Sequence, residues 1–319
     1  MDKRPIIRVE NLQLYFPETH GFKKKYLRAV DDVSFAVYPG ETIGLVGESG
    51  CGKSTLGRVV TGLLKNTGGH VYFHEKDIQR LKGQEKINYR KNVQMIFQDP
   101  AASLNPRLKV RQIIAESLLY NSGIDKKDID EKVHQIMSVV GLPSDAADKY
   151  PHEFSGGQQQ RIGIARSLIL NPEFIVCDEA VSALDVSVQA QVLNLLKKLK
   201  ADYNLTYLFI SHNLSVVRYM CDRIIVMYLG KVVEIGTAEQ IFNNPLHPYT
   251  KALISAIPVA DLKRKMERIV LTGDLPSQTD ATNGCVFFNR CYECGGKCDT
   301  MPPNLVETEK GHWVRCIKY

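Results

Sequence analysis

The feature that most constrains this chain is a glycine-rich stretch, GESGCGKST, that runs from Gly47 to Thr55. It fits the pattern G-x-x-x-x-G-K-[ST] at every fixed position. An apolar run at 43–46 precedes it and predicts a buried parallel strand, while residues 56–64 predict a helix. Strand, glycine loop and helix are the setting in which such a loop turns its backbone N–H groups toward phosphate oxygens. The stretch therefore predicts an α/β fold with a nucleotide site.

The parts of this loop have separate expected roles. Gly47 and Gly52 let the backbone turn inward, Lys53 reaches the β- and γ-phosphates, and Ser54 holds Mg²⁺. Thr55 is expected to make a second phosphate contact. A glycine-rich turn without a ligand is the alternative, and the flanking strand and helix argue against it. The predicted nucleotide contacts of the loop are Gly47, Ser49, Gly50, Cys51, Gly52, Lys53, Ser54 and Thr55.

Length and composition limit the kinds of protein that this chain can be. At 319 residues it is too long for one small core, so two or three subdomains are expected. Apolar runs fall short of the ~18–20 residues that span a bilayer, and the N-terminus lacks a signal-peptide core, which predicts a cytosolic protein. The net charge of +6 is a mild excess, and the basic run at 23–25 is interpreted as a solvated loop.

Two stretches near the N-terminus, residues 6–16 and 29–37, alternate apolar and polar side chains as strands do. A loop from Pro17 to Lys25 is expected between them, and the strands predict an antiparallel sheet beside the nucleotide core. An aromatic side chain of this sheet could stack on adenine. Phe16 is the first candidate, followed by Tyr15 and Tyr26, and an ordinary role in the sheet is as good an interpretation of each.

Polar side chains follow three of the predicted strands at their carboxyl ends, where ligands of parallel sheets bind. Gln98 is placed to contact Mg²⁺ or the attacking water. Asp178 is expected to orient Mg²⁺ through its water shell, and Glu179 to take a proton from the attacking water. His212 would sense the γ-phosphate, although a lone histidine is usually a satisfied polar residue. The strands are predicted at 93–97, 174–177 and 207–210, and the Mg²⁺ ligands are Ser54, Gln98 and Asp178.

A helical pattern covers residues 110–140 and predicts a small helical subdomain inserted into the sheet protein. Ser155 follows as a good helix N-cap, with two glycines directly after it. A capped helix start of this kind is an anion site, and a plain N-cap is the open alternative. Farther on, residues 182–185 form a turn into a helix expected at 186–199.

These elements occur in an order that resembles the ATP-binding subunit of an ABC transporter, over nearly the whole chain. The resemblance implies that two ATPase domains pair head to tail and that catalysis needs the pair. Each ATP would lie between the glycine loop of one chain and the signature of the other, which is residues 155–158 here. The residues that the resemblance adds to the nucleotide site are Ser155, Gly156, Gly157, Gln158 and Asp185.

Three further segments resemble the oligopeptide/dipeptide importer branch. They are HEFSGG at 152–157, QDP at 98–100 with SLNP at 103–106, and NPLHPYT at 244–250. Residues 177–185 resemble the F-type ATPase of that branch. The implied partners are a D-type ATPase, two membrane-spanning permease subunits and an extracytoplasmic substrate-binding protein, with this chain peripheral on the cytoplasmic face of the membrane. One departure is Asn213 where the branch has Asp, and others are Gln159 and Gln160; little effect is expected from them.

Five of the eight cysteines are crowded between Cys285 and Cys316, which in a cytosolic protein favours a metal over disulfides. The spacing resembles the tail of importer ATPases, some of which carry a [4Fe–4S] cluster. Zn²⁺ and reduced thiols stay open as alternatives, and Cys294 is an alternative ligand. A bound cluster is expected to be structural, holding the tail to itself, while Cys51 and Cys177 are expected to be packing residues. The predicted ligands are Cys285, Cys291, Cys298 and Cys316.

The expected fold is a RecA-like P-loop NTPase core of the α/β class with three additions. Residues 1–100 and 162–244 would form the core with its antiparallel β subdomain, 101–161 the helical signature subdomain, and 245–319 a small Cys-rich extension. The expected function is ATP hydrolysis for uptake of di- and oligopeptides, with other small solutes open as cargo. A non-transport ATPase acting on ribosomes or DNA is the alternative. Such a protein would have two tandem ATPase cassettes or a long coiled-coil insertion, and this sequence has one glycine loop and no long heptad run. No nucleic-acid partner is therefore expected. An iron–sulfur redox protein is excluded because the cysteines are peripheral to the ATP motifs.

Overall fold

The computed structural model describes residues 4–20, 23–121, 126–257, 268–273, 279 and 283–319. The chain divides into two compact units, each assembled from separated stretches of sequence. The glycine loop lies in one unit and the predicted signature in the other. Unit 1 is Met1–Ile6, Tyr38–Glu41 and Arg80–Ile210, and unit 2 is Ile7–Val37, Thr42–Gln79 and Ser211–Tyr319.

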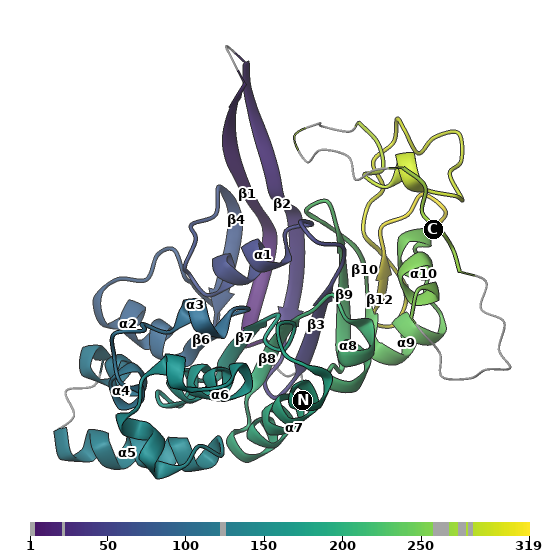
Figure 1. Cartoon of the computed structure of the whole chain (residues 1–319). Coiled ribbons are helices and arrows are strands. Elements are labelled where there is room, and N and C mark those ends of the chain that lie inside the picture. Colours follow the sequence, from purple (N-terminus) through teal and green to yellow (C-terminus); the bar gives the residue numbers. More distant parts are fainter. Residues whose placement is uncertain (1–3, 21–22, 122–125, 258–267, 274–278, 280–282) are drawn as a thin grey trace, which may run out of the picture. The chain divides into compact units, whose positions relative to one another are not determined.

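Unit 2 contains a four-stranded antiparallel sheet in the order β2-β1-β4-β5. The loop predicted at 17–25 is wrong, because most of it belongs to a long two-stranded ribbon that is seen in Figure 1. β1 pairs with β4 only from Ile7 to Gln13, so β1 has a free edge at Pro17, where a missing N–H breaks no ladder. The strands are β1 (Ile7–His20), β2 (Lys23–Val37), β4 (Gly68–Phe73) and β5 (Lys76–Asp77).

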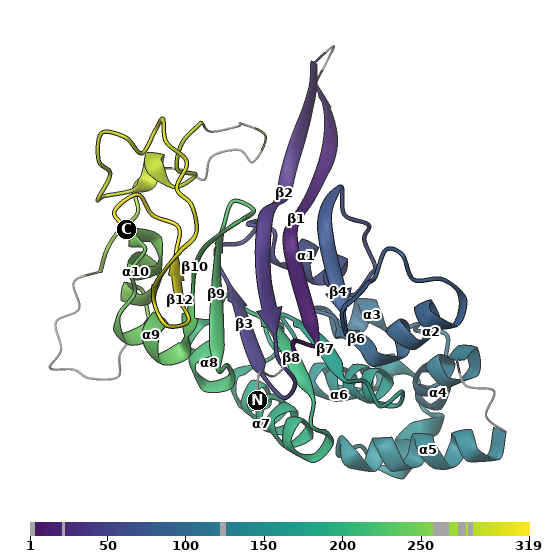
Figure 2. The ribbon, with the colours of Figure 1, turned by 180° about the vertical axis from the view of Figure 1, so that it is seen from behind.

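A second set of strands in unit 2 carries the glycine loop and runs in the order β11-β12-β10-β9-β3. β3 is parallel to β9, and the other pairs are antiparallel. β12 of the C-terminal extension pairs with β10, so the extension is tied to the sheet of unit 2 and not only to itself (Figure 2). The strands are β3 (Thr42–Val46), β9 (Arg223–Tyr228), β10 (Lys231–Thr237), β11 (Val306–Glu309) and β12 (His312–Val314).

The helices of unit 2 follow the strands that deliver the functional loops. The helix after the glycine loop begins at Lys53 and ends at Val60, so it starts earlier and is shorter than predicted. Its buried face is Leu56, Val59 and Val60, which have no exposed surface. The helices are α1 (Lys53–Val60), α8 (Leu214–Met220), α9 (Ala238–Asn243), α10 (Pro248–Ser255) and the 3₁₀ turn η3 (Phe288–Arg290).

Unit 1 is built around three parallel strands in the order β8-β7-β6. The middle strand, β7, is buried along its whole length, as its run of apolar residues predicts. The strands are β6 (Val93–Ile96), β7 (Phe174–Asp178) and β8 (Thr206–Ile210). The helices are α2 (Gly83–Asn92), α3 (Pro100–Ser103), α4 (Val110–Asn121), α5 (Lys126–Val139), η1 (Ser144–Asp148), η2 (Pro151–Glu153), α6 (Gly156–Leu168) and α7 (Val186–Tyr203).

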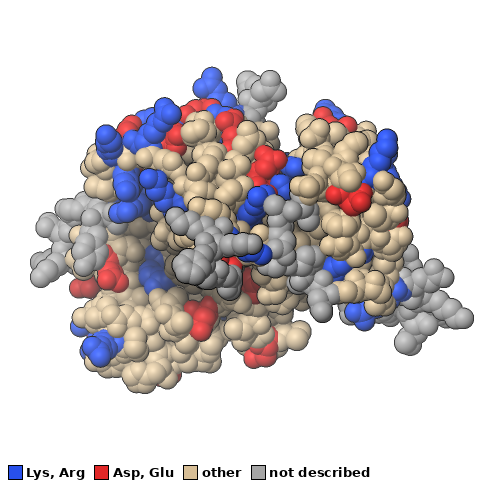
Figure 3. All heavy atoms as spheres, turned by 90° about the horizontal axis from the view of Figure 1, so that it is seen from above, with Lys and Arg blue, Asp and Glu red and all other residues tan. Residues whose placement is uncertain are grey.

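The surface carries both signs of charge. On the face seen in Figure 3, basic and acidic side chains of the described residues lie among uncharged ones. Within the described ranges, none of the helices has the length and apolar character needed to span a bilayer.

Candidate active site

The glycine loop of unit 2 is shaped by two close backbone approaches. Gly52 has φ +102°, and a Cβ there would lie 1.9 Å from the carbonyl oxygen of Ala29 in β2. Gly47 has φ +152°, and a Cβ there would lie 2.2 Å from the carbonyl oxygen of Met227 in β9. Both neighbouring atoms belong to the backbone of a strand, so they cannot move aside without disturbing that strand. The geometry therefore requires glycine at both positions that the motif fixes.

Lys53 lies across the inside of this loop. Its Nζ donates to the carbonyl oxygens of Gly47 at 2.9 Å and Glu48 at 2.8 Å, and the side chain is buried. Cys51 Sγ is 3.7 Å from the same amine, and burial raises the pKa of this thiol. The lysine charge is thus held at the centre of the loop, where an incoming phosphate would meet it.

Glu48 connects the loop to the C-terminal extension. Its N–H donates to Tyr249 Oη at 2.8 Å, and its carboxylate accepts two hydrogen bonds from the Arg290 guanidinium, at 2.7 and 3.2 Å. Neither Tyr249 nor Arg290 was among the predicted site residues. Tyr249 lies in the NPLHPYT segment and Arg290 directly precedes Cys291, and nothing in the spacing of either segment connects it to the loop.

Unit 1 brings two of the predicted catalytic residues together. Gln98 Nε2 donates to Glu179 Oε2 at 2.9 Å. Glu179 has φ +47°, and its N–H donates to the carbonyl oxygen of Ile210 in β8 at 3.0 Å, which fixes the backbone just beyond β7. Asp178, the last residue of β7, is only 2% exposed.

The predicted signature forms the N-terminus of α6 as a complete capping box. Ser155 N–H donates to Gln158 Oε1 at 3.0 Å, and Gln158 N–H donates to Ser155 Oγ at 3.4 Å. Gly157 faces α7, where an added Cβ would lie 2.3 Å from Val188 Cγ1. Ser155, Gly156 and Gln158 are exposed. The helix start is therefore both preformed and open to another molecule.

Asp185 and Asn213 are helix N-caps. Asp185 accepts from the N–H of Val188 at 3.0 Å and from Ser187 Oγ at 2.9 Å, and the backbone hydrogen bond lowers its pKa. Asn213 Oδ1 accepts from the N–H of Ser215 at 3.0 Å at the start of α8. An aspartate at 213 would accept the same hydrogen bond. Asn213 in place of aspartate therefore preserves the helix cap that follows His212.

The aromatic candidates differ in what they already contact. Tyr15 Oη donates to Asp31 Oδ1 at 2.5 Å, and the Arg28 guanidinium lies 5.6 Å from the centre of its ring. Phe16 and Tyr26 are 36% and 49% exposed. Phe16 stays the first candidate for adenine.

The predicted site residues are distributed over both units. Unit 2 contains Phe16, the glycine loop and His212. Unit 1 contains Gln98, Asp178, Glu179, the signature and Asp185.

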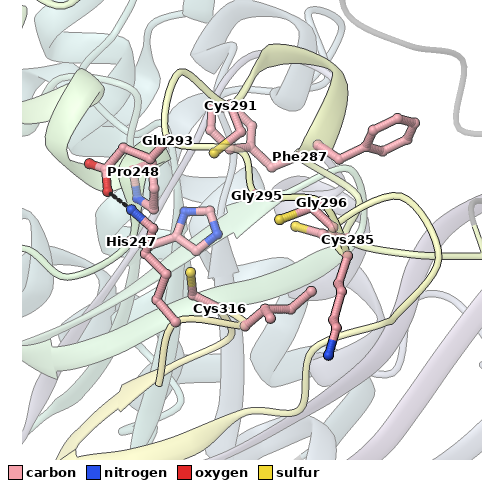
Figure 4. A pocket seen from close by; sticks show the side chains of 14 residues that line it. His247, Pro248, Cys285, Phe287, Cys291, Glu293, Gly295, Gly296 and Cys316 are labelled. Carbon is pink, nitrogen blue, oxygen red and sulfur yellow. Dashed lines mark hydrogen bonds and ion pairs between the residues drawn. The ribbon is translucent and has the colours of Figure 1, made fainter.

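The four predicted cysteine ligands line one cavity of about 250 Å³ in the extension, and Cys294 does not. Figure 4 shows the sulfur atoms of Cys285, Cys291 and Cys316 pointing toward the same space, beside the His247 ring. Burial raises the pKa of Cys285 and of Cys291 to about 11, with a smaller effect from neighbouring cysteines. Among the described residues, no group of three or more His, Cys, Asp or Glu side chains is arranged to hold a metal ion.

Comparison with known proteins agrees with these motifs. The family model described as ABC transporter matches residues 30–182, and the oligopeptide/dipeptide transporter C-terminal region matches residues 233–298. The chain is 50% identical over 325 residues to the oligopeptide transport ATP-binding protein AppF of Bacillus subtilis, covering 100% of this chain and 98% of the relative. It is 47% identical to OppF of Salmonella typhimurium, covering 99% and 97%, and 46% identical to the dipeptide transport protein DppF of Haemophilus influenzae, covering 99% and 97%.

Solved structures give the same fold. The dimeric ABC transporter cassette MJ0796 aligns with a TM-score of 0.65 and 28% identity, over 73% of this chain and 98% of that one. The cbiO1 component of Clostridium perfringens aligns with a TM-score of 0.64 and 25% identity, over 75% and 91%. The ribosome- or DNA-acting alternative is not favoured by these relatives. The chain therefore belongs to the ABC transporter family, within the oligopeptide/dipeptide branch of its ATP-binding subunits.

Proposed function

We propose that this chain hydrolyses ATP for an importer of di- and oligopeptides, in a head-to-tail pair with a second ATPase. The observation that carries the proposal is the exposed, fully capped start of α6 in a chain that also holds a complete glycine loop. The N-terminus of a helix favours an anion because its first N–H groups have no intrahelical partners, and Ser155, Gly156 and Gln158 are exposed here. In the pair, residues 155–158 would contact the γ-phosphate of the partner's ATP, and Asp185 would lie beside it.

In this mechanism the chain's own residues have separate roles at the ATP bound by the glycine loop. Lys53 and the loop N–H groups would hold the phosphates, and Ser54, Gln98 and Asp178 would hold Mg²⁺. Glu179 takes the proton of the attacking water, with Gln98 donating to its other side to fix its orientation. His212 would contact the γ-phosphate. The bound ion would neutralise charge that builds up on the phosphate oxygens.

The relatives support the rest of the importer. AppF and OppF are named as oligopeptide transport ATP-binding proteins and DppF as a dipeptide transport ATP-binding protein. The partner of this chain would be a D-type ATPase of the same importer. Two permeases and an extracytoplasmic binding protein would complete the assembly, with this chain peripheral on the cytoplasmic face. Residues 101–161 would be the helical signature subdomain and residues 245–319 the importer extension of the core.

A groove on unit 1 is suited to receive a short cytoplasmic helix of a permease. It has a volume of about 770 Å³ and mixes apolar and charged residues from α4 and α5. Leu119 is 61% exposed at this groove, although large aliphatic side chains are usually buried. The lining residues are Leu108, Arg111, Gln112, Ala115, Glu116, Leu119, Ile129 and Asp130.

Replacing Leu119 by arginine should remove the chain from the importer without affecting ATP binding. A charge in the groove would have to be desolvated when the permease helix docks. The chain would be co-expressed with the partner ATPase and both permeases, and the recovered complex quantified. Leu63→Arg is the control, because Leu63 is 57% exposed and lies beyond the far end of α1. Recovery of an intact, transporting complex with Leu119→Arg would count against this docking surface.

We further propose that the cysteine cavity holds a [4Fe–4S] cluster. Four thiolates can hold either a [4Fe–4S] cluster or one Zn²⁺. The support for the proposal is that the four cysteines line one cavity, of about 250 Å³. A bound cluster would supply four iron–thiolate bonds that join separate segments of the extension.

Cys298→Ser should abolish iron and sulfide in anaerobically purified protein, together with its visible absorption band. Cys294→Ser should leave both at wild-type levels, because Cys294 does not line the cavity. If the wild type and Cys294→Ser contain equal amounts of zinc and Cys298→Ser contains none, the cavity holds a zinc ion and not a cluster. Protein without any bound metal would mean that the cavity holds reduced thiols.

A further inference from the structure

We propose that Arg290 is a positioning residue for the nucleotide loop, through which the C-terminal extension sets how tightly this chain binds ATP. The inference needs only that the loop binds ATP, and it holds whatever occupies the cysteine cavity. It assigns a role to two residues far apart in sequence, Glu48 inside the loop and Arg290 in the extension, which lie in the same unit.

The contact between them has the geometry of a specific pair. Arg290 Nη1 and Nη2 each donate to a different carboxylate oxygen of Glu48, at 2.7 and 3.2 Å. The side chains are only 9% and 24% exposed, so solvent screens the pair much less than it would on the surface. Planar two-point pairing of this kind fixes orientation as well as distance, which a lysine cannot do.

A second contact from the extension reaches the same residue. Tyr249 of α10 is buried, and its Oη accepts the Glu48 N–H at 2.8 Å. The Tyr249 ring lies 4.7 Å from the Tyr228 ring and 5.4 Å from the Phe287 ring, measured between centroids. Glu48 is thus held at its backbone and at its side chain by two separate parts of the C-terminal region.

Glu48 in turn holds the groups that meet the phosphates. Its carbonyl oxygen accepts from Lys53 Nζ at 2.8 Å and from the Cys51 N–H at 3.3 Å. A shift of Glu48 would therefore move both the lysine and the loop. The Glu48 carboxylate would also repel ATP if the Arg290 charge were removed, because a like charge would then lie inside an anion site. Both effects lower ATP affinity.

The segment that carries Arg290 is a tight turn between two cavity cysteines. Phe288 N–H donates to the Cys285 carbonyl at 3.1 Å, and Arg290 N–H donates to the Phe287 carbonyl at 3.0 Å. Cys291 N–H closes the turn on the Phe288 carbonyl at 3.3 Å. These hydrogen bonds fix the Arg290 backbone within the extension, so that a displacement of the turn would be passed through its side chain to Glu48.

Arg315 offers a matched control elsewhere in the extension. It also directly precedes a cavity cysteine, Cys316, and it pairs with a carboxylate, Asp32 Oδ2, at 3.3 Å. Its partner lies in β2 and outside the glycine loop. Removing either arginine takes one charge from the extension and breaks several side-chain hydrogen bonds. Of the two side chains, it is Arg290 that contacts the glycine loop.

The test is ATP binding by the full chain without its partner, measured by calorimetry for Arg290→Gln, Glu48→Gln, the double variant and Arg315→Gln. We expect Arg290→Gln to weaken ATP binding about tenfold or more, and Arg315→Gln to stay within about twofold of wild type. The double variant should bind ATP better than Arg290→Gln, because the uncompensated carboxylate is then gone. In the assembled ATPase, Arg290→Gln should raise KM with little change in kcat.

Equal affinities for Arg290→Gln and Arg315→Gln would overturn the inference, as would additive losses in the double variant. Thermal unfolding of each variant separates a general loss of stability from a specific loss of ATP binding. If Arg290→Gln does not fold, Arg290→Lys gives the answer: it should bind ATP more weakly than Arg315→Gln, and equal binding would contradict the proposal.

Discussion

Replacement of Glu179 by glutamine is expected to lower the ATP hydrolysis rate of the assembled enzyme by about 100- to 10,000-fold, the range typical of a lost general base. ATP affinity should stay within about twofold of wild type. Glutamine has the same shape, and its amide oxygen can still accept from Gln98 Nε2, which is 2.9 Å from Glu179 Oε2 in the structure. The variant therefore removes proton acceptance and keeps the local geometry, so ATP should bind and remain uncleaved.

Glu173→Gln is the control for this experiment, because Glu173 directly precedes the opposite end of the same strand, β7. It changes the charge of the chain equally and should leave the rate within about twofold of wild type. Turnover by Glu179→Gln at the rate of Glu173→Gln would show that another group accepts the proton.

Replacement of Gly52 by alanine is the second change with a large expected effect. The added Cβ would lie 1.9 Å from the Ala29 carbonyl oxygen, and φ at this position is +102°, which disfavours any side chain. The clash can be relieved only if the loop before α1 shifts, and Lys53 at the start of α1 would shift with it. We expect ATP affinity to fall at least about 100-fold, which corresponds to ~2.7 kcal/mol, as measured by equilibrium binding to the full chain.

Gly83→Ala separates the backbone effect from the steric effect. Gly83 also has positive φ, +49°, but a Cβ there would meet nothing within 4 Å. This variant should lose a little stability and bind ATP as the wild type does. Wild-type ATP affinity in Gly52→Ala would mean that the loop adapts, and that the close approach to Ala29 does not define the site.

The parts of this protein that could be predicted from sequence are those in which local rules decide the structure. The glycine loop, the buried strand ending at Asp178 and the Ser155 cap each depend on neighbours within a few residues. Short apolar runs and capping residues carry enough information to place such elements. The four cysteines predicted as ligands line one cavity, and there the resemblance to a family supplied the grouping of distant residues.

Long-range contacts could not be predicted in the same way. The Glu48–Arg290 pair joins residues that are 242 positions apart, and no spacing rule connects them. The pairing of β12 with β10 likewise depends on how the extension returns to its own sheet. The prediction placed a loop at 17–25, whereas most of these residues pair in the ribbon of β1 and β2. Proline is tolerated on an edge strand, so its presence did not exclude a strand there.

The central claim is that ATP at this glycine loop becomes a complete site only with the signature of a second chain. The most direct measurement is the association of the Glu179→Gln chain with its partner ATPase, followed by sedimentation with and without Mg-ATP. We predict a pair that forms only with Mg-ATP and is lost when Ser155 at the start of α6 is changed to arginine. Full ATP hydrolysis by the wild-type chain as a strict monomer, with no nucleotide-dependent pairing, would contradict the account.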